Sequence, residues 1–457
     1  MTFQPQPADE PFAEAKQRWQ LDLLYTDLGV VKGRGLTRVE KTYLRGLLCG
    51  YGPNEIAEQL QVKNDTVRNA LSKGLYRYIE GRLSEQQPDL IRVESWGQVA
   101  RLLGEAGYQR QLGRGKGKVP QRLYLDGLPD APEFYGREAE LAQLSQAIGQ
   151  DNCRVLLLLG MGGIGKTTLA AHLLRHNQSD FDYVVWQSLA HAPAAEPLFE
   201  ALLTHLLPET QRPTVNGESS LSQLLRLMKS HRCLIVLEDF QSVLSGGQFV
   251  GHYRDGYGAY GEFLRRVGEE THQSCLVLTS WEKPREVAHL EGMGGRVRSH
   301  LLQGLPNAAA RQILSQYQLT NPEAWDDLIR PYRANPLALK IVATTIRDLF
   351  EGSVDEYLNQ NTLFLGDFTY LLHQQMARLS ELETIIVKHL ATVTTPMSLA
   401  DLKTSIFPKR RQSEWIAALE SLHRRSILET RHADQKLLFS LQPVVMKYVT
   451  SQLVTEG

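Results

Sequence analysis

The sequence lacks the features of a membrane-bound, secreted or strongly charged protein. No apolar run approaches the length needed to cross a bilayer, and the N-terminal stretch MTFQPQPADEPF lacks the basic and then apolar pattern of a secretory signal. The 50 Lys and Arg residues nearly cancel the 51 Asp and Glu residues, so any basic surface must be local. We therefore expect a cytoplasmic protein with no membrane partner.

Cysteine is scarce, and its four positions form no recognisable site. Cys49, Cys153, Cys233 and Cys275 are far apart, and three of them lie in or beside strand-like runs. This pattern is typical of small buried hydrophobic residues and not of disulfides or metal ligands.

The motifs of several other chemistries are absent. The sequence contains no H-E-x-x-H, no G-x-S-x-G and no C-x-x-C, and its thirteen histidines are scattered. No period of 20 to 50 residues is visible, so the sequence does not predict a repeat array. The overall composition is that of an ordinary globular protein. A chain of 457 residues is too long to fold around a single hydrophobic core. Several domains are therefore expected.

One glycine-rich stretch, in contrast, carries a clear chemical signal. Residues 154–171 read RVLLLLGMGGIGKTTLAA, which fits the phosphate-binding pattern G-x-x-x-x-G-K-[ST] between an apolar strand and a helix. Glycines let backbone N–H groups curl around a polyphosphate, and the following helix adds its positive end. The alternative is a glycine-rich turn that binds nothing. The expected nucleotide-binding residues are Gly160, Gly162, Gly163, Ile164, Gly165, Lys166, Thr167 and Thr168.

Three side chains of this loop have separate expected roles. Lys166 would reach the β- and γ-phosphates, Thr167 would place its hydroxyl on Mg²⁺, and Thr168 would touch the α-phosphate. The sequence therefore predicts ATP or ADP together with Mg²⁺ as cofactors.

The segment before the loop domain predicts a small helical module. Helices are expected at Arg38 to Leu48, at Glu55 to Leu60 and from Asn64 or Asp65 onward, with a tight turn between the last two. Two short helices joined in this way form a helix-turn-helix, and this one resembles the DNA-binding domains of response regulators and sigma factors. By that resemblance the nucleic-acid contacts would be Lys63, Thr66, Arg68, Asn69, Ser72 and Lys73. The alternative is a trihelical module that binds protein, because the fold does not fix the ligand.

A block upstream of the phosphate loop completes a family pattern. Phe134-Tyr135-Gly136-Arg137-Glu138 precedes an amphipathic helix and then the loop. This arrangement resembles the NB-ARC group of STAND ATPases, the switch proteins that include plant resistance proteins and many bacterial multidomain regulators. The resemblance implies that Tyr135, Gly136 and Arg137 contact the adenine.

Further motifs follow in the order of that family. The apolar run from Cys233 to Leu237 ends in Glu238 and Asp239, which resemble the second acidic motif of P-loop ATPases. The resemblance implies that Glu238 holds Mg²⁺ through water and that Asp239 polarises the attacking water. Pro336 resembles the proline that packs on the adenine, and Gln442 stands where the family has a histidine that contacts the β-phosphate of ADP.

Three positions depart from the family pattern. Glu238 replaces the usual aspartate, Trp281 stands where the γ-phosphate sensor is usually arginine, and Gln442 replaces histidine. A glutamine can still donate a hydrogen bond, but it adds no charge. The residues that hold a nucleotide are thus better kept than those that cleave and sense it, so we expect slow hydrolysis or none. The sequence LSGGQ at 244–248 follows the acidic strand at once, and we interpret it as a turn and not as an ABC-transporter signature.

The predicted fold is a multidomain α/β plus α protein. It combines an ASCE-type P-loop parallel sheet with a helical lid and a C-terminal winged helix, preceded by a small all-α helix-turn-helix domain. The predicted ranges are a partly helical extension at 1–35, the helix-turn-helix domain at 36–110, a basic glycine-rich linker at 111–128, the nucleotide-binding domain at 129–300, the helical subdomain at 301–375 and the winged helix at 376–457.

Three functions are compatible with this organisation. The first is a signalling switch that binds ATP and ADP and acts through its N-terminal domain, by a protein partner or by self-association. The second is an ATP-dependent regulator that binds DNA through the helix-turn-helix. The third is a scaffold that holds ADP permanently without turnover. Family members usually continue into WD, tetratricopeptide or leucine-rich repeats that sense a ligand, so the activating signal is not predicted.

Overall fold

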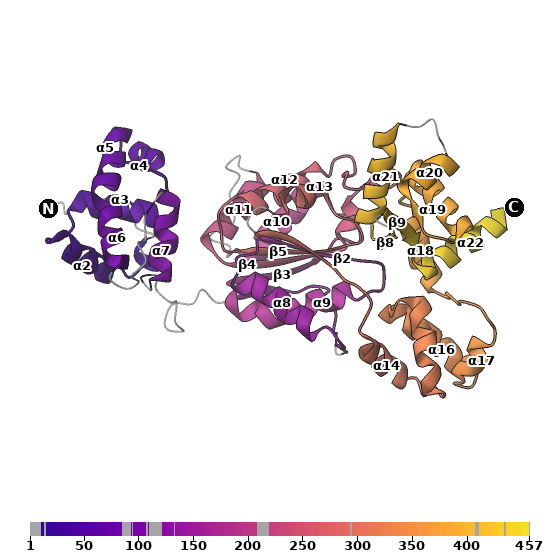
Figure 1. Cartoon of the computed structure of the whole chain (residues 1–457). Helices are drawn as coiled ribbons and strands as arrows, with labels where there is room; N and C mark the ends of the chain where they lie inside the picture. The colour runs from indigo at the N-terminus through magenta and orange to yellow at the C-terminus, as the bar shows by residue number, and fades with distance from the viewer. Residues whose placement is uncertain are drawn as a thin grey trace. The chain divides into compact units, whose positions relative to one another are not determined.

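The computed structural model divides the chain into two compact units, Met1–Lys118 and Val119–Gly457 (Figure 1). It describes residues 11–12, 15–84, 93, 95–106, 108, 121–131, 133–207, 219–292, 295–406, 411–433 and 436–456. Most of the predicted linker, 111–120, lies outside these residues.

The described part of the first unit is helical and has its own hydrophobic core. Helix α3 has the predicted bounds, Arg38–Leu48, and begins with a capping box in which Thr37 and Glu40 satisfy each other's backbone N–H groups. Helix α4 begins two residues earlier than predicted, at Pro53, because proline suits the first helical position. The remaining helices are α1 (Ala15–Arg18), α2 (Leu21–Lys32), α5 (Asn64–Ala70), η1 (Leu71–Leu75), α6 (Tyr76–Ser84), η2 (Trp96–Gln98) and α7 (Val99–Glu105).

The second unit contains a six-stranded sheet with the order β1-β3-β4-β5-β2-β6. Every neighbouring pair in it is parallel. Strands β2 and β4 fall where the apolar runs predicted them, whereas residues 122–124 of the predicted linker form the edge strand β1 instead. The strands are β1 (Arg122–Tyr124), β2 (Val155–Leu159), β3 (Tyr183–Ser188), β4 (Cys233–Glu238), β5 (Cys275–Ser280) and β6 (Val297–Leu301).

Helices cover both faces of this sheet (Figure 1). Alternate residues of each central strand point to opposite faces, so both faces need apolar side chains. Leu156 and Leu158 of β2 pack on the same side as Leu169 and Leu173, whereas Leu157 belongs to the core on the other face. One face carries α8 (Glu138–Gly149) and α9 (Lys166–Asn177), and the other carries α10 (Ala195–Leu206), α11 (Ser220–Ser230), α12 (Gly258–Glu269) and α13 (Arg285–Leu290).

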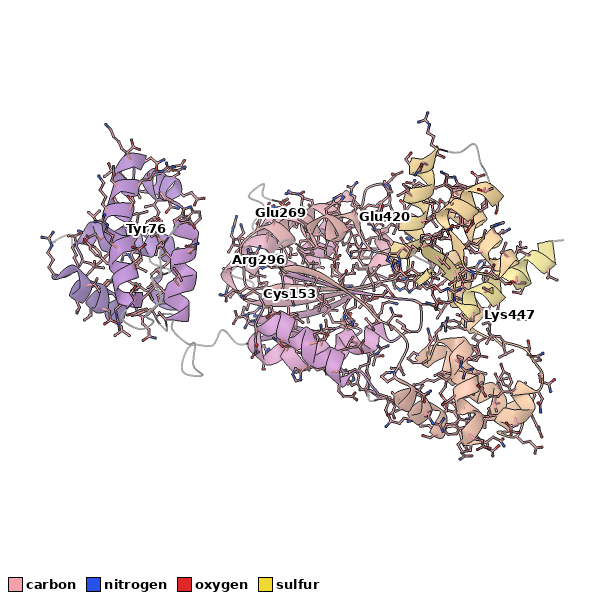
Figure 2. All side chains as sticks on the ribbon, viewed as in Figure 1. Tyr76, Cys153, Glu269, Arg296, Glu420 and Lys447 are labelled. Atoms are coloured by element: carbon pink, nitrogen blue, oxygen red, sulfur yellow. The ribbon has the colours of Figure 1, made fainter. Side chains whose placement is uncertain are left out.

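The four cysteines agree with the sequence interpretation. None of the four forms a disulfide, and Cys153, Cys233 and Cys275 are buried. Figure 2 shows Cys153 beside the sheet of the second unit. The three buried cysteines belong to the hydrophobic cores on the two faces of the sheet, where the Cys153 thiol also donates to the Val155 carbonyl.

The rest of the second unit is mainly helical and shares one hydrophobic core. It also contains a small antiparallel sheet with the order β7-β9-β8. The predicted names helix-turn-helix and winged helix remain predictions, since they rest on resemblance. The elements are α14 (Asn307–Ser315), η6 (Pro322–Ala324), α15 (Trp325–Ile329), η7 (Arg330–Tyr332), α16 (Pro336–Leu349), α17 (Val354–Leu358), α18 (Phe368–Met376), α19 (Glu381–Val393), β7 (Met397–Ser398), α20 (Leu399–Ser405), α21 (Gln412–Arg424), β8 (Leu428–Ala433), β9 (Lys436–Leu441) and α22 (Pro443–Glu456).

A buried histidine makes the stability of this unit dependent on pH. The ring of His272 contacts the Val267 carbonyl through Nε2 and accepts a hydrogen bond from the Ser274 N–H at Nδ1. Burial lowers the pKa of His272 to about 4 with a smaller contribution from Arg154, while the hydrogen bonds to Val267 and Ser274 and the charge of Glu270 oppose the shift. The unfolded chain, with a pKa near 6.5, therefore binds more protons than the folded chain between pH 6.5 and 4.

We expect the free energy of unfolding to fall by up to about 3 kcal/mol from this group as pH falls from 6.5 to 4. Urea denaturation of the wild type and of His272→Gln across this range checks the expectation. Carboxylates that titrate in the same window affect both proteins, so the difference between the two curves isolates His272. Parallel curves would show that His272 contributes nothing.

Candidate functional site

The phosphate loop leaves the buried strand β2 and enters α9 through three left-handed glycines. Gly160, Gly163 and Gly165 have φ values of 147°, 76° and 102°. Side chains other than glycine are strained in this region, which explains why the loop needs glycine at these positions. Gly165 is the residue that caps α9. The loop therefore has the backbone shape that a polyphosphate cradle requires.

Lys166 is buried at the start of α9, with 7% of its surface exposed. Its Nζ donates to the carbonyls of Gly160 and Met161, at 2.9 Å each. Burial lowers the pKa of Lys166 to about 7, and the nearby carboxylates of Asp239 and Glu238 only partly oppose this shift. Phosphate oxygens would supply the negative charge that this ammonium group needs.

The two candidate magnesium ligands are in direct contact at the carboxyl end of β4. Thr167 lies in α9 and Glu238 ends β4, and the Thr167 hydroxyl donates to Glu238 Oε1 at 2.7 Å. Burial raises the pKa of the Glu238 carboxyl, while the hydrogen bond from Thr167 lowers it. Hydroxyl and carboxylate oxygens are the ligands that Mg²⁺ accepts, directly or through water. The longer arm of glutamate thus still reaches the threonine at the loop.

Asp239 is held by residues that sequence reasoning missed. Its backbone is left-handed, with a φ of 56°, and its N–H donates to Thr279 Oγ1 at 3.0 Å. Gln241 donates from Nε2 to Asp239 Oδ1 at 2.9 Å and accepts from the Trp281 N–H at 3.3 Å. Gln241 therefore fixes the direction of the Asp239 carboxylate. Its position two residues after Asp239 was the only local signal for this role.

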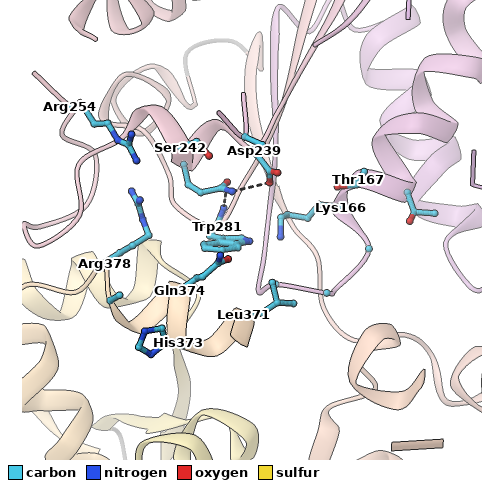
Figure 3. A pocket seen from close by; sticks show the side chains of 17 residues that line it. Lys166, Thr167, Asp239, Ser242, Arg254, Trp281, Leu371, His373, Gln374 and Arg378 are labelled. Atoms are coloured by element: carbon cyan, nitrogen blue, oxygen red, sulfur yellow. Dashed lines mark hydrogen bonds between the residues drawn. The ribbon is translucent and has the colours of Figure 1, made fainter. Parts of the chain in front are cut away.

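Lys166, Thr167, Asp239 and Gln241 line a cavity of about 710 Å³, whereas Glu238 is not among the described residues that line it (Figure 3). This volume lies within the range of pockets that hold small molecules and cofactors. The phosphate loop forms one wall, and residues from the segment after β4 and from α18 and its C-terminal end form others. Besides Gly162, Gly163 and Gly165, the lining residues are Lys166, Thr167, Thr168, Ala190, Asp239, Gln241, Ser242, Arg254, Trp281, Leu371, His373, Gln374, Ala377 and Arg378.

The candidate adenine contacts lie at a junction beside the loop. Arg137 is buried and donates to both oxygens of Glu140, to the Ile164 carbonyl and to the Gln303 carbonyl. Gly136 approaches α14 so closely that a Cβ there would lie 2.5 Å from the Cβ of Ala309. The segment thereby ties the loop to the helical part. Tyr135, Gly136 and Arg137 are not among the described residues that line the cavity.

The start of α16 touches the phosphate loop directly. Asn335 donates from Nδ2 to the Gly162 carbonyl at 3.0 Å, and the Leu337 N–H donates to the Gly163 carbonyl at 3.3 Å. Asn335 Oδ1 also caps the helix by accepting from the Leu337 and Ala338 N–H groups. Pro336 is the first residue of this helix. The helical part is therefore bonded to the loop that would surround the phosphates.

This close contact leads to a prediction for Gly163→Ala. A Cβ at Gly163 would lie 2.7 Å from the Cβ of Leu337, and the φ of 76° disfavours alanine. We expect the free energy of unfolding to fall by about 1–3 kcal/mol, measured by urea denaturation. Gly149→Ala is the matched control, since a Cβ there meets no atom within 4 Å. Equal stability of the two variants would contradict the packing of α16 on the loop.

The other sequence-predicted residues lie elsewhere. Gln442 lies between β9 and α22, where its carbonyl accepts from the Met446 N–H, and it is not among the described residues that line the cavity. In the first unit, all six candidate nucleic-acid contacts are exposed. Arg68 donates to Asn54 Oδ1 at 3.1 Å, and Ser72 donates to the Arg68 carbonyl. Among the described residues, no helix is both long and apolar enough to span a bilayer.

Known proteins resemble this chain in the region of the cavity. The NB-ARC domain family matches residues 137–243. An uncharacterized WD repeat-containing protein from Nostoc sp. is 39% identical over 343 residues, which cover 72% of this chain and 27% of that protein. The probable disease resistance protein RF45 of Arabidopsis thaliana is 28% identical over 166 residues, which cover 35% of this chain and 16% of that protein. The chain thus spans about a quarter or less of the length of these relatives.

Among solved structures, a STAND protein with a tetratricopeptide repeat sensor from Pyrococcus horikoshii is 18% identical. The alignment covers 70% of this chain and 43% of that chain, with a TM-score of 0.34.

The family match contains the phosphate loop and the acidic strand, whereas Arg254, Trp281 and the α18 wall of the cavity lie outside it. It begins at Arg137, includes the phosphate loop, β4, Glu238 and Asp239, and ends at Val243. The family resemblance predicted from the sequence is thereby confirmed. Residues 137–243 of this chain form an NB-ARC domain.

Proposed function

We propose that this protein is a nucleotide-dependent switch. ATP or ADP binds in the phosphate loop with Mg²⁺ on Thr167 and Glu238, and the identity of the nucleotide changes the arrangement of the helical part. The N-terminal domain carries the output, through a protein partner or through self-association.

The observation that carries this proposal is the bond between the loop and α16. Asn335 and Leu337 hydrogen-bond to the carbonyls of Gly162 and Gly163, so a nucleotide that reshapes the loop also acts on the helical part. Reversing a two-state equilibrium from 1:99 to 99:1 requires a differential affinity of about 10⁴, or roughly 5.5 kcal/mol. One contact to a third phosphate supplies only part of this energy, so contacts between the domains must supply the rest.

Hydrolysis is expected to be slow. Asp239 is positioned at the cavity, but Trp281 contributes no charge where the family's sensor arginine stands. The acid that polarises water is thus present, whereas one stabiliser of the γ-phosphate charge is missing. This combination favours a long-lived triphosphate state over rapid turnover.

Analysis of the bound nucleotide tests the proposal. The purified full chain is denatured, any released nucleotide is identified by chromatography, and ATP turnover with Mg²⁺ is followed beside a Lys166→Met control. Exchangeable ADP and slow turnover that is lost in the variant would support the switch. ADP that never exchanges would favour the scaffold, and a protein that neither carries nor binds a nucleotide would overturn both.

A second candidate function is DNA binding by the first unit. All six candidate contacts are exposed, including the basic residues Lys63, Arg68 and Lys73, while Val67 between them is buried. If this face binds DNA, affinity for a random duplex should fall steeply with salt, and Arg68→Ala should weaken it about tenfold. Fluorescence anisotropy measures both effects, with the exposed Arg34→Ala, in the loop before α3, as a control on another element. Binding that is insensitive to salt, or equal in the two variants, would exclude it.

A further inference from the structure

A buried network of charges joins the nucleotide-binding sheet to the C-terminal helices. Glu282, which follows β5 and is 2% exposed, accepts from Arg378 Nε at 2.5 Å and from Arg425 Nη1. Arg425 also donates from Nε to Glu383 Oε1 at 3.1 Å. Two acids and two bases thus neutralise one another, which buried charges require. We call these four residues the buried charge network.

The two arginines of this network are not equivalent. Arg425 is 2% exposed and is bound on several sides, by Glu282, Glu383 and the Gln248 carbonyl. Arg378 is more exposed, at 14% of its side chain, and it also lines the cavity. If Arg378 leaves, Glu282 keeps Arg425 as its partner. Arg378 is therefore the member that can exchange its partner at the lower cost.

Arg378 also holds the segment 244–250, which follows the acidic strand. Its Nη2 donates to the carbonyls of Leu244 and Ser245, at 3.0 and 3.4 Å. The Gly247 N–H donates to the Arg378 carbonyl at 2.9 Å, and the Val250 N–H donates to Ser421 Oγ of α21 at 2.7 Å. A change in the partner of the Arg378 guanidinium would break its two bonds to Leu244 and Ser245, and would thereby loosen the contact between this segment and the C-terminal helices.

The cavity offers few cations for a third phosphate. Among the described residues that line it, the lysine and arginine side chains are those of Lys166, Arg254 and Arg378, and Figure 3 shows that Arg254 and Arg378 point toward each other. Arg254 is exposed and lies in the nucleotide-binding domain itself, so it transmits no change to the C-terminal helices. Arg378, in contrast, follows α18 of the C-terminal helices and is bonded to Glu282 and Leu244 of the nucleotide-binding domain.

We propose that Arg378 contacts the third phosphate of a bound nucleoside triphosphate and leaves Glu282 to do so. This inference rests on the proposed function and specifies its regulation. A diphosphate leaves Arg378 on Glu282, and the segment 244–250 stays docked. A triphosphate competes with Glu282 for the guanidinium group, because phosphate oxygens and carboxylates bind the same arginine fork. Undocking of the segment then accompanies the triphosphate state.

Two substitutions with opposite expected effects test this proposal. Affinities of nucleotide-stripped full-length protein for ADP and for AMP-PNP, each with Mg²⁺, are measured by calorimetry. Arg378→Gln removes the phosphate contact, so its affinity for AMP-PNP should fall about tenfold while that for ADP changes less than twofold. Glu282→Gln removes the competitor, so the preference for AMP-PNP over ADP should rise. Arg378→Lys should retain part of the preference, and the exposed Arg347→Gln should match the wild type.

The outcomes separate this inference from the proposed function. If Arg378 only fastens the domains, both substitutions break the same contact and shift the nucleotide preference in the same direction or not at all, which would overturn the inference. Arg378→Gln alone decides the matter if Glu282→Gln does not fold, since Arg425 still neutralises Glu282 in that variant. A wild-type protein that binds neither nucleotide would overturn the proposed function and this inference together.

Discussion

Lys166→Met is expected to weaken binding of Mg²⁺-ADP at least about 100-fold. The ammonium group is buried at the phosphate loop, and hydrogen bonds to charged groups contribute about 1.5–3 kcal/mol each. At an ADP concentration 100 times the wild-type Kd, ligand binding stabilises the wild type by about 2.7 kcal/mol. A variant with a 100-fold weaker Kd gains only about 0.4 kcal/mol at the same concentration. Thermal and urea unfolding with and without ADP measure this difference.

Without nucleotide, Lys166→Met should be no less stable than the wild type. Burial lowers the pKa of Lys166 to about 7, so the folded protein holds this charge at a cost that methionine removes. Lys229→Met is the control, because Lys229 pairs with Glu270 on an exposed surface. Full stabilisation of Lys166→Met by ADP would contradict the assignment of the loop.

Arg425→Met is expected to lower the free energy of unfolding by about 3–5 kcal/mol. The substitution leaves the buried Glu383 without its cation and Glu282 with Arg378 alone. Removing one partner of a buried ion pair costs this much because an uncompensated charge remains away from water. Urea denaturation of the full chain gives the change.

Two further variants make this measurement specific. Arg347→Met removes an arginine whose pair with Asp348 is exposed, and it should change stability by less than about 0.5 kcal/mol. Adding Glu383→Gln to Arg425→Met should cost less than Glu383→Gln alone, because the two residues interact. A loss below about 1 kcal/mol for Arg425→Met would show that this network does not hold the C-terminal helices.

The sequence predicted the parts of the site that depend on local pattern. The apolar run before Gly160 and the run before Glu238 both had to be buried strands, and parallel strands place their carboxyl ends at one edge. Thr167 and Glu238, 71 residues apart, therefore meet as expected. The segment 244–248, predicted as a turn directly after the acidic strand, is separated from that strand by the 3₁₀ helix η5 (Phe240–Val243), and its Leu244 pairs with Tyr253. Its contact with Arg378 had no local signal.

The parts that the sequence did not predict come from separate segments. Glu282, Arg378 and Arg425 each look like an ordinary surface charge in a linear sequence, and only the packing of three elements brings them together. The contact of Gln241 with Asp239 had only a weak signal in the sequence, because a glutamine two residues after an acidic residue can have many roles. The strand β1 was missed because three residues are too few for an alternating pattern.

The central claim is that di- and triphosphate nucleotides favour different arrangements of the second unit. Hydrogen–deuterium exchange of the full chain, saturated with Mg²⁺-ADP or with Mg²⁺-AMP-PNP, tests it most directly, read at residues 244–250 and 335–339. We expect slow exchange in both segments with ADP and faster exchange with AMP-PNP, because the docked contacts break. Equal exchange in the two saturated states would contradict the switch.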